Sequence, residues 1–212
     1  MVWAVHEASG FGKFFLNGDF VGWKEGLQKH WDEIGADDDA RNTFSVARKF
    51  TEDFGPLEDV EMVKQFETKK NVKEIAALAE ITNKLLIAHQ SLKEIIEEAE
   101  PGIHQFWPME IVMPREKIYP ESYFGMRIGQ FLDSFQPDES DEASFHDSPL
   151  YFGSDTKKAT AGLAMSPSII GDAQIWREKR IRRPNIFISD ALQQRILDAG
   201  LQLPKHYQTM VV

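Results

Sequence analysis

The chain has 212 residues and a formal net charge of -10, from 34 acidic side chains against 24 lysines and arginines. This balance excludes the simplest kind of duplex nucleic-acid binder, which uses a basic face to displace counterions from the phosphates. The chain has no cysteine, so disulfide scaffolds, thiolate zinc sites and thiol nucleophiles are excluded too. Apolar residues make up 42% and charged residues 27% of the chain, which is typical of a folded globular protein.

The beginning of the chain predicts no export signal. Residues 1–10 contain neither the basic segment nor the apolar run of a secretory signal. Nowhere does an apolar run approach the roughly 20 residues that a bilayer-spanning helix needs. We therefore expect a soluble cytoplasmic protein.

Short strands and turns are expected in the first 30 residues. Residues 2–6 and 14–16 are β-type runs, and Asn17-Gly18-Asp19 carries the Asn-Gly pair of two-residue hairpins. A first acidic segment, residues 32–39, predicts a solvated loop, because it lacks the ligand register of a calcium-binding EF-hand. Its acids are Asp32, Glu33, Asp37, Asp38 and Asp39.

Two stretches in the next part of the chain have helical character. Residues 57–70 predict a surface helix, with Val60, Val63 and Phe66 on one side. Residues 72–99 contain neither proline nor glycine and could form one long helix. An internal likeness within the sequence argues against a single helix.

Two segments 100 residues apart share a pattern, residues 86–99 and residues 186–199. The coinciding residues are Leu92 with Leu192, Ile96 with Ile196, and Ala99 with Ala199. In the second copy, a short β-branched run precedes Ser189 or Asp190, either of which can cap a helix, and Gly200 can end that helix. By analogy, residues 72–99 divide into helix, strand and helix.

The sequence therefore predicts an α+β fold with mixed or antiparallel sheets and several helices. Two strand-helix units form a pseudo-repeat, at residues 84–99 and 185–199. We expect one domain over residues 1–212, in which an N-terminal part, residues 1–70, is distinguished from a core, residues 83–212. Further strands are expected at residues 105–112, 123–131 and 173–176.

Charge is distributed unevenly in the second half of the chain. A second acidic segment, residues 133–147, has no lysine or arginine and predicts a long exposed loop. A basic run, residues 177–183, has five cations and one anion. Three interpretations of this run stay open: it contacts the acidic loops within the fold, guards a sheet edge, or binds an anionic partner. The acids of the second segment are Asp133, Asp138, Glu139, Asp141, Glu142 and Asp147.

Motifs that carry catalytic chemistry are weak in this sequence. No two of the six histidines lie three to five residues apart, which excludes paired metal ligands on one helix. The serines lack a Gly-x-Ser-x-Gly elbow, and no complete phosphate-binding loop is present. Trp23, Trp31 and Trp107 are interpreted as core packing rather than as a platform for a ligand.

From Asn83 onward, the sequence resembles a bacterial immunity protein family, counted as the eleventh of the polymorphic toxin systems. The most specific feature is the strand-helix unit that ends at Ala99, followed by Glu100-Pro101-Gly102-Ile103-His104-Gln105-Phe106-Trp107-Pro108. The second feature is Asn185-Ile186-Phe187-Ile188-Ser189-Asp190 with the helix after it. The chain departs from the family after that helix, where Leu203-Pro204-Lys205-His206-Tyr207 replaces a glycine and an aromatic residue.

This resemblance implies a cytoplasmic antitoxin that binds and blocks a toxin encoded by the adjacent gene and delivered between bacterial cells, for which we expect type VI secretion. It implies no catalytic residue, no cofactor and no metal. Acidic loops suit a basic toxin, because complementary charge raises the rate of encounter. The candidate partner-binding residues are Asp37, Asp38, Asp39, Asp138, Glu139, Asp141 and Glu142.

Two other functions compete with this interpretation. The first is a small enzyme that uses carboxylates with His104 or His146 in a cleft, which predicts a pocket lined by groups with perturbed titration. The second is a module that binds nucleic acid or another anion through the basic run at residues 177–183.

Overall fold

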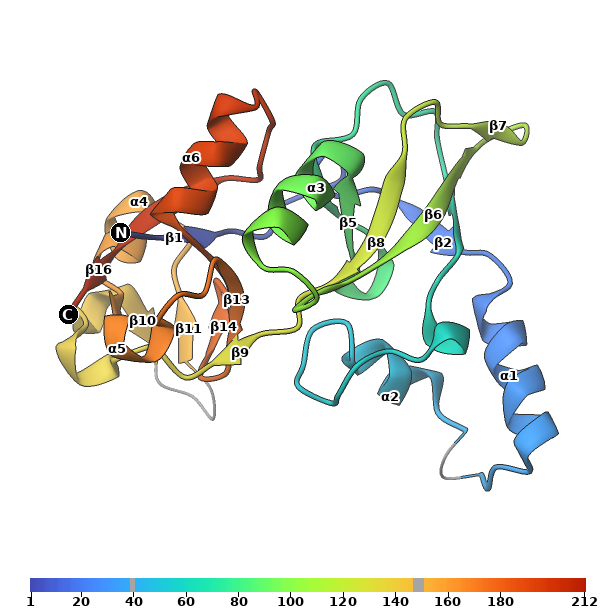
Figure 1. The fold of residues 1–212 in the computed structure, drawn as a ribbon, viewed down its shortest axis with the longest axis horizontal. Helices are drawn as coiled ribbons and strands as arrows, with labels where there is room; N and C mark the ends of the chain where they lie inside the picture. Colours follow the sequence, from blue (N-terminus) through green and yellow to red (C-terminus); the bar gives the residue numbers. More distant parts are fainter. Residues whose placement is uncertain (39–40, 147–150) are drawn as a thin grey trace. The chain divides into compact units, whose positions relative to one another are not determined.

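The computed structural model describes residues 1–38, 41–146 and 151–212. The chain forms two compact units, each assembled from separate segments. The terminal unit consists of Met1–Ser9, Glu94–His104 and Ile128–Val212, and the central unit of Gly10–Lys93 and Gln105–Arg127. Both units contain helices and strands (Figure 1), so the predicted α+β class is confirmed.

The main sheet of the terminal unit brings the two ends of the chain together. β1 (Val2–Val5) pairs antiparallel with both β15 (Ile186–Ser189) and β16 (His206–Val211). β16 forms even though the segment that departs from the family pattern includes its first two residues, His206 and Tyr207. The sheet continues through β13 (Ile175–Glu178) to β9 (Phe131–Leu132) on one side and ends at β12 (Ala164–Met165) on the other. Its core includes Phe135, Trp176 and Phe187, which are fully buried.

A smaller sheet and short helices complete the terminal unit. The sheet consists of β10 (Phe145–His146), β11 (Tyr151–Gly153) and β14 (Ile181–Arg183). The helices are α4 (Lys157–Ala161), α5 (Pro167–Ile170) and α6 (Asp190–Asp198). Two 3₁₀ turns, η3 (Pro137–Glu139) and η4 (Glu142–Ser144), lie within the second acidic segment.

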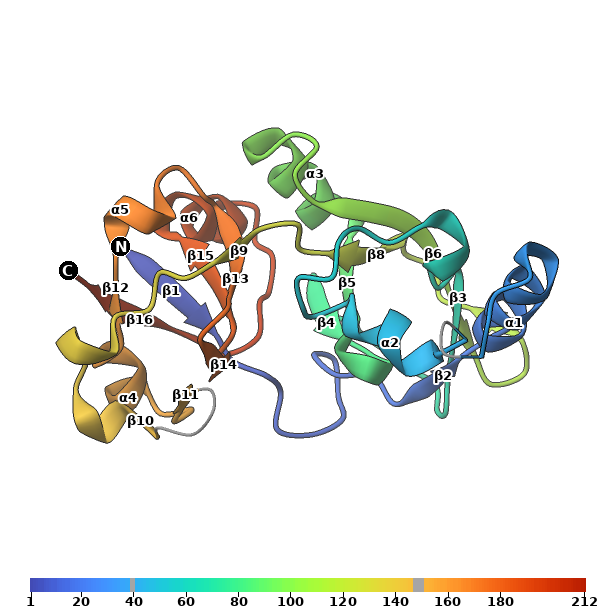
Figure 2. The same ribbon diagram turned by 90° about the horizontal axis from the view of Figure 1, so that it is seen from below.

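The central unit is built on one mixed sheet. Its order is β2 (Gly18–Phe20), β3 (Gln65–Thr68), β6 (Gln105–Met113), β8 (Tyr123–Arg127), β5 (Leu86–His89) and β4 (Leu78–Glu80), and β7 (Lys117–Ile118) pairs with β6. The sheet curves around α2 (Thr43–Arg48), as Figure 2 shows. α1 (Trp23–Ile34) joins α2 in covering the core.

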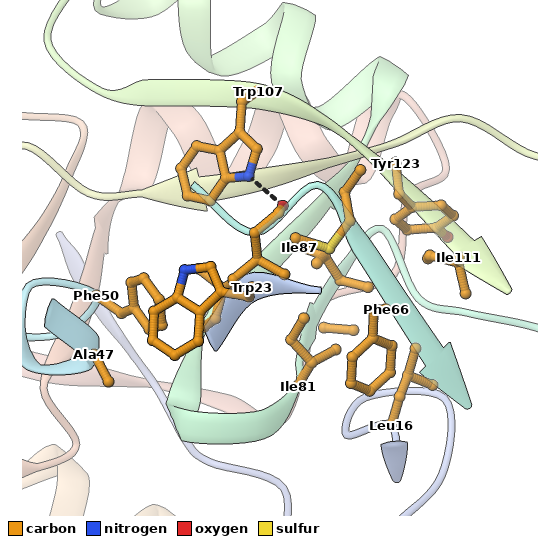
Figure 3. Close-up of a cluster of buried hydrophobic side chains, with 14 of the residues drawn as sticks. Leu16, Trp23, Ala47, Phe50, Phe66, Ile81, Ile87, Trp107, Ile111 and Tyr123 are labelled. Atoms are coloured by element: carbon orange, nitrogen blue, oxygen red, sulfur yellow. Dashed lines mark hydrogen bonds between the residues drawn. The ribbon is translucent and has the colours of Figure 1, made fainter. Parts of the chain in front are cut away.

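The core of the central unit is rich in aromatic rings (Figure 3). Trp107 Nε1 donates a hydrogen bond to the carbonyl oxygen of Val63 at 2.7 Å, and Trp23 Nε1 donates to that of Glu61 at 2.8 Å. Each indole therefore combines an apolar body with a satisfied polar group. Trp23, Trp31 and Trp107 are all buried, which confirms their predicted place in the core.

The pseudo-repeat is confirmed with its spacing of 100 residues. β5 leads into α3 (Gln90–Ala99), and β15 leads into α6. In the second copy, Ser189 Oγ accepts the amide of Leu192 at 3.0 Å; in the first copy, His89 Nδ1 accepts the amide of Ser91 at 3.2 Å. Both helices are followed by a glycine with positive φ, Gly102 at 71° and Gly200 at 68°. A side-chain acceptor at the start and a left-handed glycine after the end thus mark both helices, although the accepting residue differs between the two copies.

Two predicted helices are wrong. Residues 57–70 form the 3₁₀ turn η1 (Asp59–Glu61) and then β3, in which Phe66 and Thr68 are buried and Glu67 is exposed. This alternation has the period of a strand. The helix expected at the start of residues 72–99 is replaced by β4 and the 3₁₀ turn η2 (Thr82–Lys84), because β4 pairs with β5.

The N-terminal region also differs from expectation. The predicted hairpin does not form: Gly18 opens β2, which pairs with β3. Residues 23–34, within which we expected turns and a loop, form helix α1. Its buried residues Trp23, Leu27 and Trp31 are spaced by four, which places them on one face of a helix.

No helix in the described parts of the chain is long and apolar enough to cross a membrane. The two units interleave along the sequence. The expectation of one domain with a distinct part at residues 1–70 and a core at residues 83–212 stays a prediction.

Candidate functional site

The first acidic segment begins in the last turn of α1, in the central unit. Asp32 accepts hydrogen bonds from the Arg41 guanidinium and, at 3.1 Å, from Gln28 Nε2. The bond from Arg41, more than any other interaction, lowers the pKa of Asp32 below its ordinary value. Asp37 and Asp38 are exposed, and the predicted residue Asp39 lies outside the described residues. The carboxylates of Asp37 and Asp38 therefore face solvent.

The second acidic segment is held firmly to the terminal unit. Its start is held by Glu178, a buried residue of β13 whose carboxylate accepts the amide of Ser134 at 3.1 Å and that of Phe135 at 3.3 Å. The Ser134 hydroxyl and Trp176 Nε1 also donate to this carboxylate. Burial raises the pKa of Glu178, and these hydrogen bonds only partly offset the effect of burial.

Backbone contacts hold the middle of the second acidic segment as well. The amide of Gln136 donates to the carbonyl oxygen of Ala164, and the amide of Asp141 to that of Gly162, both at 2.9 Å. The amide of Ala164 in turn donates to Ser140 Oγ at 2.8 Å. In its described part, residues 133–146, the predicted long loop is thus an ordered segment with short 3₁₀ turns, and Asp147 lies outside the described residues.

Four of the predicted binding residues are displayed on this ordered segment. They are all exposed: Asp138, Glu139, Asp141 and Glu142. The structure therefore places the described candidate residues at the surface, as predicted. It assigns Asp37 and Asp38 to the central unit and these four residues to the terminal unit. Their role in binding a partner stays a prediction.

The basic run at residues 177–183 is largely engaged within the terminal unit. Arg177 is buried and its Nη1 donates to Asn185 Oδ1 at 3.1 Å. Arg180 Nε lies 3.6 Å from Asp133 Oδ1, and Arg183 Nη2 lies 3.2 Å from Glu7 Oε2. Asp133 belongs to the second acidic segment, so the structure favours the interpretation that the run contacts the acids of the fold.

His104 and Glu100 form a buried polar cluster in the terminal unit. His104 Nε2 lies 2.8 Å from Glu100 Oε2, and His104 Nδ1 accepts the amide of Gly129 at 3.1 Å. The same carboxylate accepts the amides of Gln174 at 2.8 Å and Ile175 at 3.1 Å, and the side chain of Gln130. Both ring nitrogens of His104 are therefore used inside the fold.

The pKa of Glu100 reflects two opposing effects. Burial, the larger single effect, would raise it, but the hydrogen bonds from His104, Gln174 and Gln130 together lower the pKa below its ordinary value. An ionised Glu100 thus links the end of α3 to the start of β13. This cluster has the properties of a structural tie, and the other histidine proposed for an enzyme, His146, is exposed on β10.

No group of three or more histidine, aspartate or glutamate residues in the described part of the chain could hold a metal ion. Sequence reasoning missed the two buried glutamates, Glu100 and Glu178, that organise the terminal unit. It also missed the exposed rings of Phe44 and Phe54. The signal for Phe44 was the spacing of Val46 and Ala47 in α2 and Phe50 just after it, which leaves the opposite side of the helix to solvent.

The described candidate carboxylates are thus exposed, whereas His104 is engaged within the fold. The sequence matches the Immunity protein family (Imm11) over residues 15–210, and the chain belongs to this family. The resemblance noted from Asn83 onward is thereby confirmed and extends through most of the central unit. Membership implies a role in toxin immunity that does not involve catalysis. No curated protein matches the chain.

Proposed function

We propose that the chain is a cytoplasmic immunity protein that binds a cognate toxin and blocks it by covering a surface that the toxin needs. The match to the immunity family over residues 15–210 carries this proposal. The toxin is encoded by the adjacent gene and is delivered between cells, with type VI secretion as the expected route. No cofactor takes part in the inhibition.

Electrostatic attraction contributes to binding in this proposal. The chain has a net charge of -10, and the carboxylates of Asp138, Glu139, Asp141 and Glu142 are exposed on an ordered segment. An ordered segment loses little conformational freedom on binding, and complementary charge accelerates association. A toxin that acts on nucleic acid has a cationic substrate site, which is the kind of surface that such an acidic segment would cover.

The direct test is co-expression with the adjacent open reading frame. We expect the chain to restore growth of cells that make the toxin, and to co-purify with the toxin as a stable complex. The control is co-expression of the same toxin with an immunity protein from an unrelated toxin system, which should restore nothing. Failure of both rescue and co-purification would overturn the proposal.

A further inference from the structure

An aromatic and cationic surface lies on α2 and the turn that follows it. Val46, Ala47 and Phe50 anchor this region in the core of the central unit. On the opposite side, Phe44 is 72% exposed, and Arg48 follows one helical turn later on the same side. The Arg48 guanidinium lies 4.4 Å from the centroid of the Phe54 ring, which belongs to a side chain that is 50% exposed. We call Phe44, Arg48 and Phe54 the aromatic surface.

The aromatic surface is held in place before any partner binds. Arg48 Nη2 lies 2.6 Å and Nε 3.2 Å from Glu52 Oε2, which fixes the guanidinium against Phe54. Asn42 Oδ1 accepts the amide of Phe44 at 2.9 Å and so fixes the backbone at the other end. A surface that is already ordered loses little side-chain entropy on association.

The aromatic surface has the residue types that are found at the centre of protein-protein interfaces. Aromatic residues and arginine are the types that contribute most to binding where proteins meet. Val46, Ala47 and Phe50 already anchor this region in the core, and the rings of Phe44 on α2 and Phe54 in the turn after it remain exposed. By contrast, the second acidic segment directs Phe135 inward, where its ring packs against Phe145 and Tyr151 with centroids 5.4 Å and 5.3 Å away.

Acidic residues border the aromatic surface along the chain. Residues 32–59 contain nine acids and three cations, and among the acids Asp37, Asp38 and Asp53 are exposed. An acidic border repels the phosphates of nucleic acids and the headgroups of anionic lipids, and attracts lysine and arginine. The complementary partner is a protein face with an apolar centre and a basic border.

We propose that the aromatic surface, with the acidic residues that flank it in the sequence, is the docking site for the toxin, and that the toxin presents such a basic face. This inference rests on the proposed function and adds the place of contact. In this inference, the residues that contribute most to the affinity of the complex lie in the central unit. The acidic residues alone did not point to this surface.

The experiment measures the Kd for a catalytically inactivated toxin, made from the adjacent open reading frame, by isothermal titration calorimetry. We expect the double variant Phe44→Ala/Phe54→Ala to bind at least about tenfold more weakly than the wild-type chain. Phe152→Ala, which removes an exposed ring of the terminal unit, is the matched control and should change the Kd less than about twofold. Thermal melting of each variant establishes that it is folded.

A second variant keeps the inference testable if the double variant does not fold. Phe44→Lys changes one exposed side chain and places a cation opposite the apolar centre of the toxin face, inside its basic border, so it should weaken binding at least as much as the double alanine variant. Sedimentation of the chain alone tests whether a second copy of the chain, rather than the toxin, covers the aromatic surface. A dimer that the double variant abolishes would show that a second copy of the chain covers this surface, and would overturn the inference.

The outcomes separate the two proposals. Suppose that the wild-type chain binds the toxin, and that Phe44→Ala/Phe54→Ala and Phe44→Lys bind it as tightly as the wild-type chain does. The proposed docking site is then wrong, and the proposed function stands. If the wild-type chain itself neither binds nor restores growth, the proposed function fails.

Discussion

Glu100 and Glu178 are two buried glutamates of the terminal unit whose pKa values shift in opposite directions. Glu100 has a lowered pKa because donors from His104, Gln174 and Gln130 together outweigh its burial. Glu178 has a raised pKa because burial outweighs the donors from Ser134, Phe135 and Trp176. The balance between desolvation and hydrogen bonding therefore sets the sign of the pKa shift at each residue.

The first prediction concerns Glu100→Gln. This change keeps the shape of the side chain, removes its charge, and leaves donors without an ionised acceptor, so it should cost about 2–4 kcal/mol of unfolding free energy at neutral pH. Urea unfolding measures the difference. Glu98→Gln is the control, because Glu98 is an exposed partner of Arg195, and it should cost less than about 1 kcal/mol.

The pH dependence of these variants is the second prediction. A lowered folded pKa gives stability that is complete above the ordinary pKa, near 4.5, and is lost as the pH falls through the folded value. The cost of Glu100→Gln should therefore shrink in acid. The raised pKa of Glu178 reverses the sign: the wild-type chain loses stability relative to Glu178→Gln as the pH rises above about 4.5. Parallel pH profiles for the two variants would contradict this assignment.

Two glycines of the central unit provide a third prediction. A Cβ at Gly125 would lie 2.2 Å from the Trp107 ring, whereas one at Gly26 in α1 meets nothing within 4 Å. Gly125→Ala should destabilise the chain by about 2–3 kcal/mol, because Trp107 cannot move without disturbing the core. Gly26→Ala should stabilise it by about 0.5–1 kcal/mol, because alanine favours a helix. Thermal melting distinguishes the two, and equal shifts would be inconsistent with this packing.

At the scale of elements, the strand-helix pseudo-repeat depends on local caps. Ser189 Oγ accepts the amide of Leu192 and begins α6. Ser189→Ala should cost about 1 kcal/mol, whereas Ser189→Thr keeps the hydroxyl and should cost less. The measurement is urea unfolding of both variants. A loss in the threonine variant as large as that in the alanine variant would show that the cap hydroxyl is not the cause.

The elements that could be predicted are those with strong local signals. The two strand-helix units carry caps and terminal glycines, and β6 is rich in aromatic and branched residues. The prediction failed for β3 and β4, which are short strands of four and three residues. β3 forms by pairing with β6, which is distant in sequence, and β4 by pairing with β5. α1 was missed because the acids near its end suggested a loop, although Trp23, Leu27 and Trp31 already had helical spacing.

The candidate site was predictable in part for a similar reason. Charged residues are exposed almost wherever they occur, so the surface position of Asp138, Glu139, Asp141 and Glu142 followed from composition. Composition did not predict that this segment is ordered, because its order depends on Glu178, a residue 40 positions away from Asp138 in sequence. Exposure of Phe44 likewise became visible only once α2 and its buried side were known.

At the scale of the whole molecule, the charge of -10 should act on the rate of association with the toxin. Replacing Asp138, Glu139, Asp141 and Glu142 by their amides should slow association about tenfold at low salt and flatten its salt dependence. Asp172→Asn, an exposed acid outside both acidic segments, is the single-site control. Stopped-flow mixing with the inactivated toxin measures the rates. Binding that is insensitive to salt and to these changes would remove the electrostatic part of the proposal.

The central claim is that this member of the immunity family neutralises a toxin by binding and covering it. Titration of the active toxin with the purified chain tests this claim most directly. The account predicts complete inhibition at a fixed stoichiometric ratio, with full toxin activity recovered after the complex is separated. Inhibition by far less than a stoichiometric amount of the chain, leaving a toxin that stays inactive after separation, would contradict it, since that is the behaviour of a catalyst.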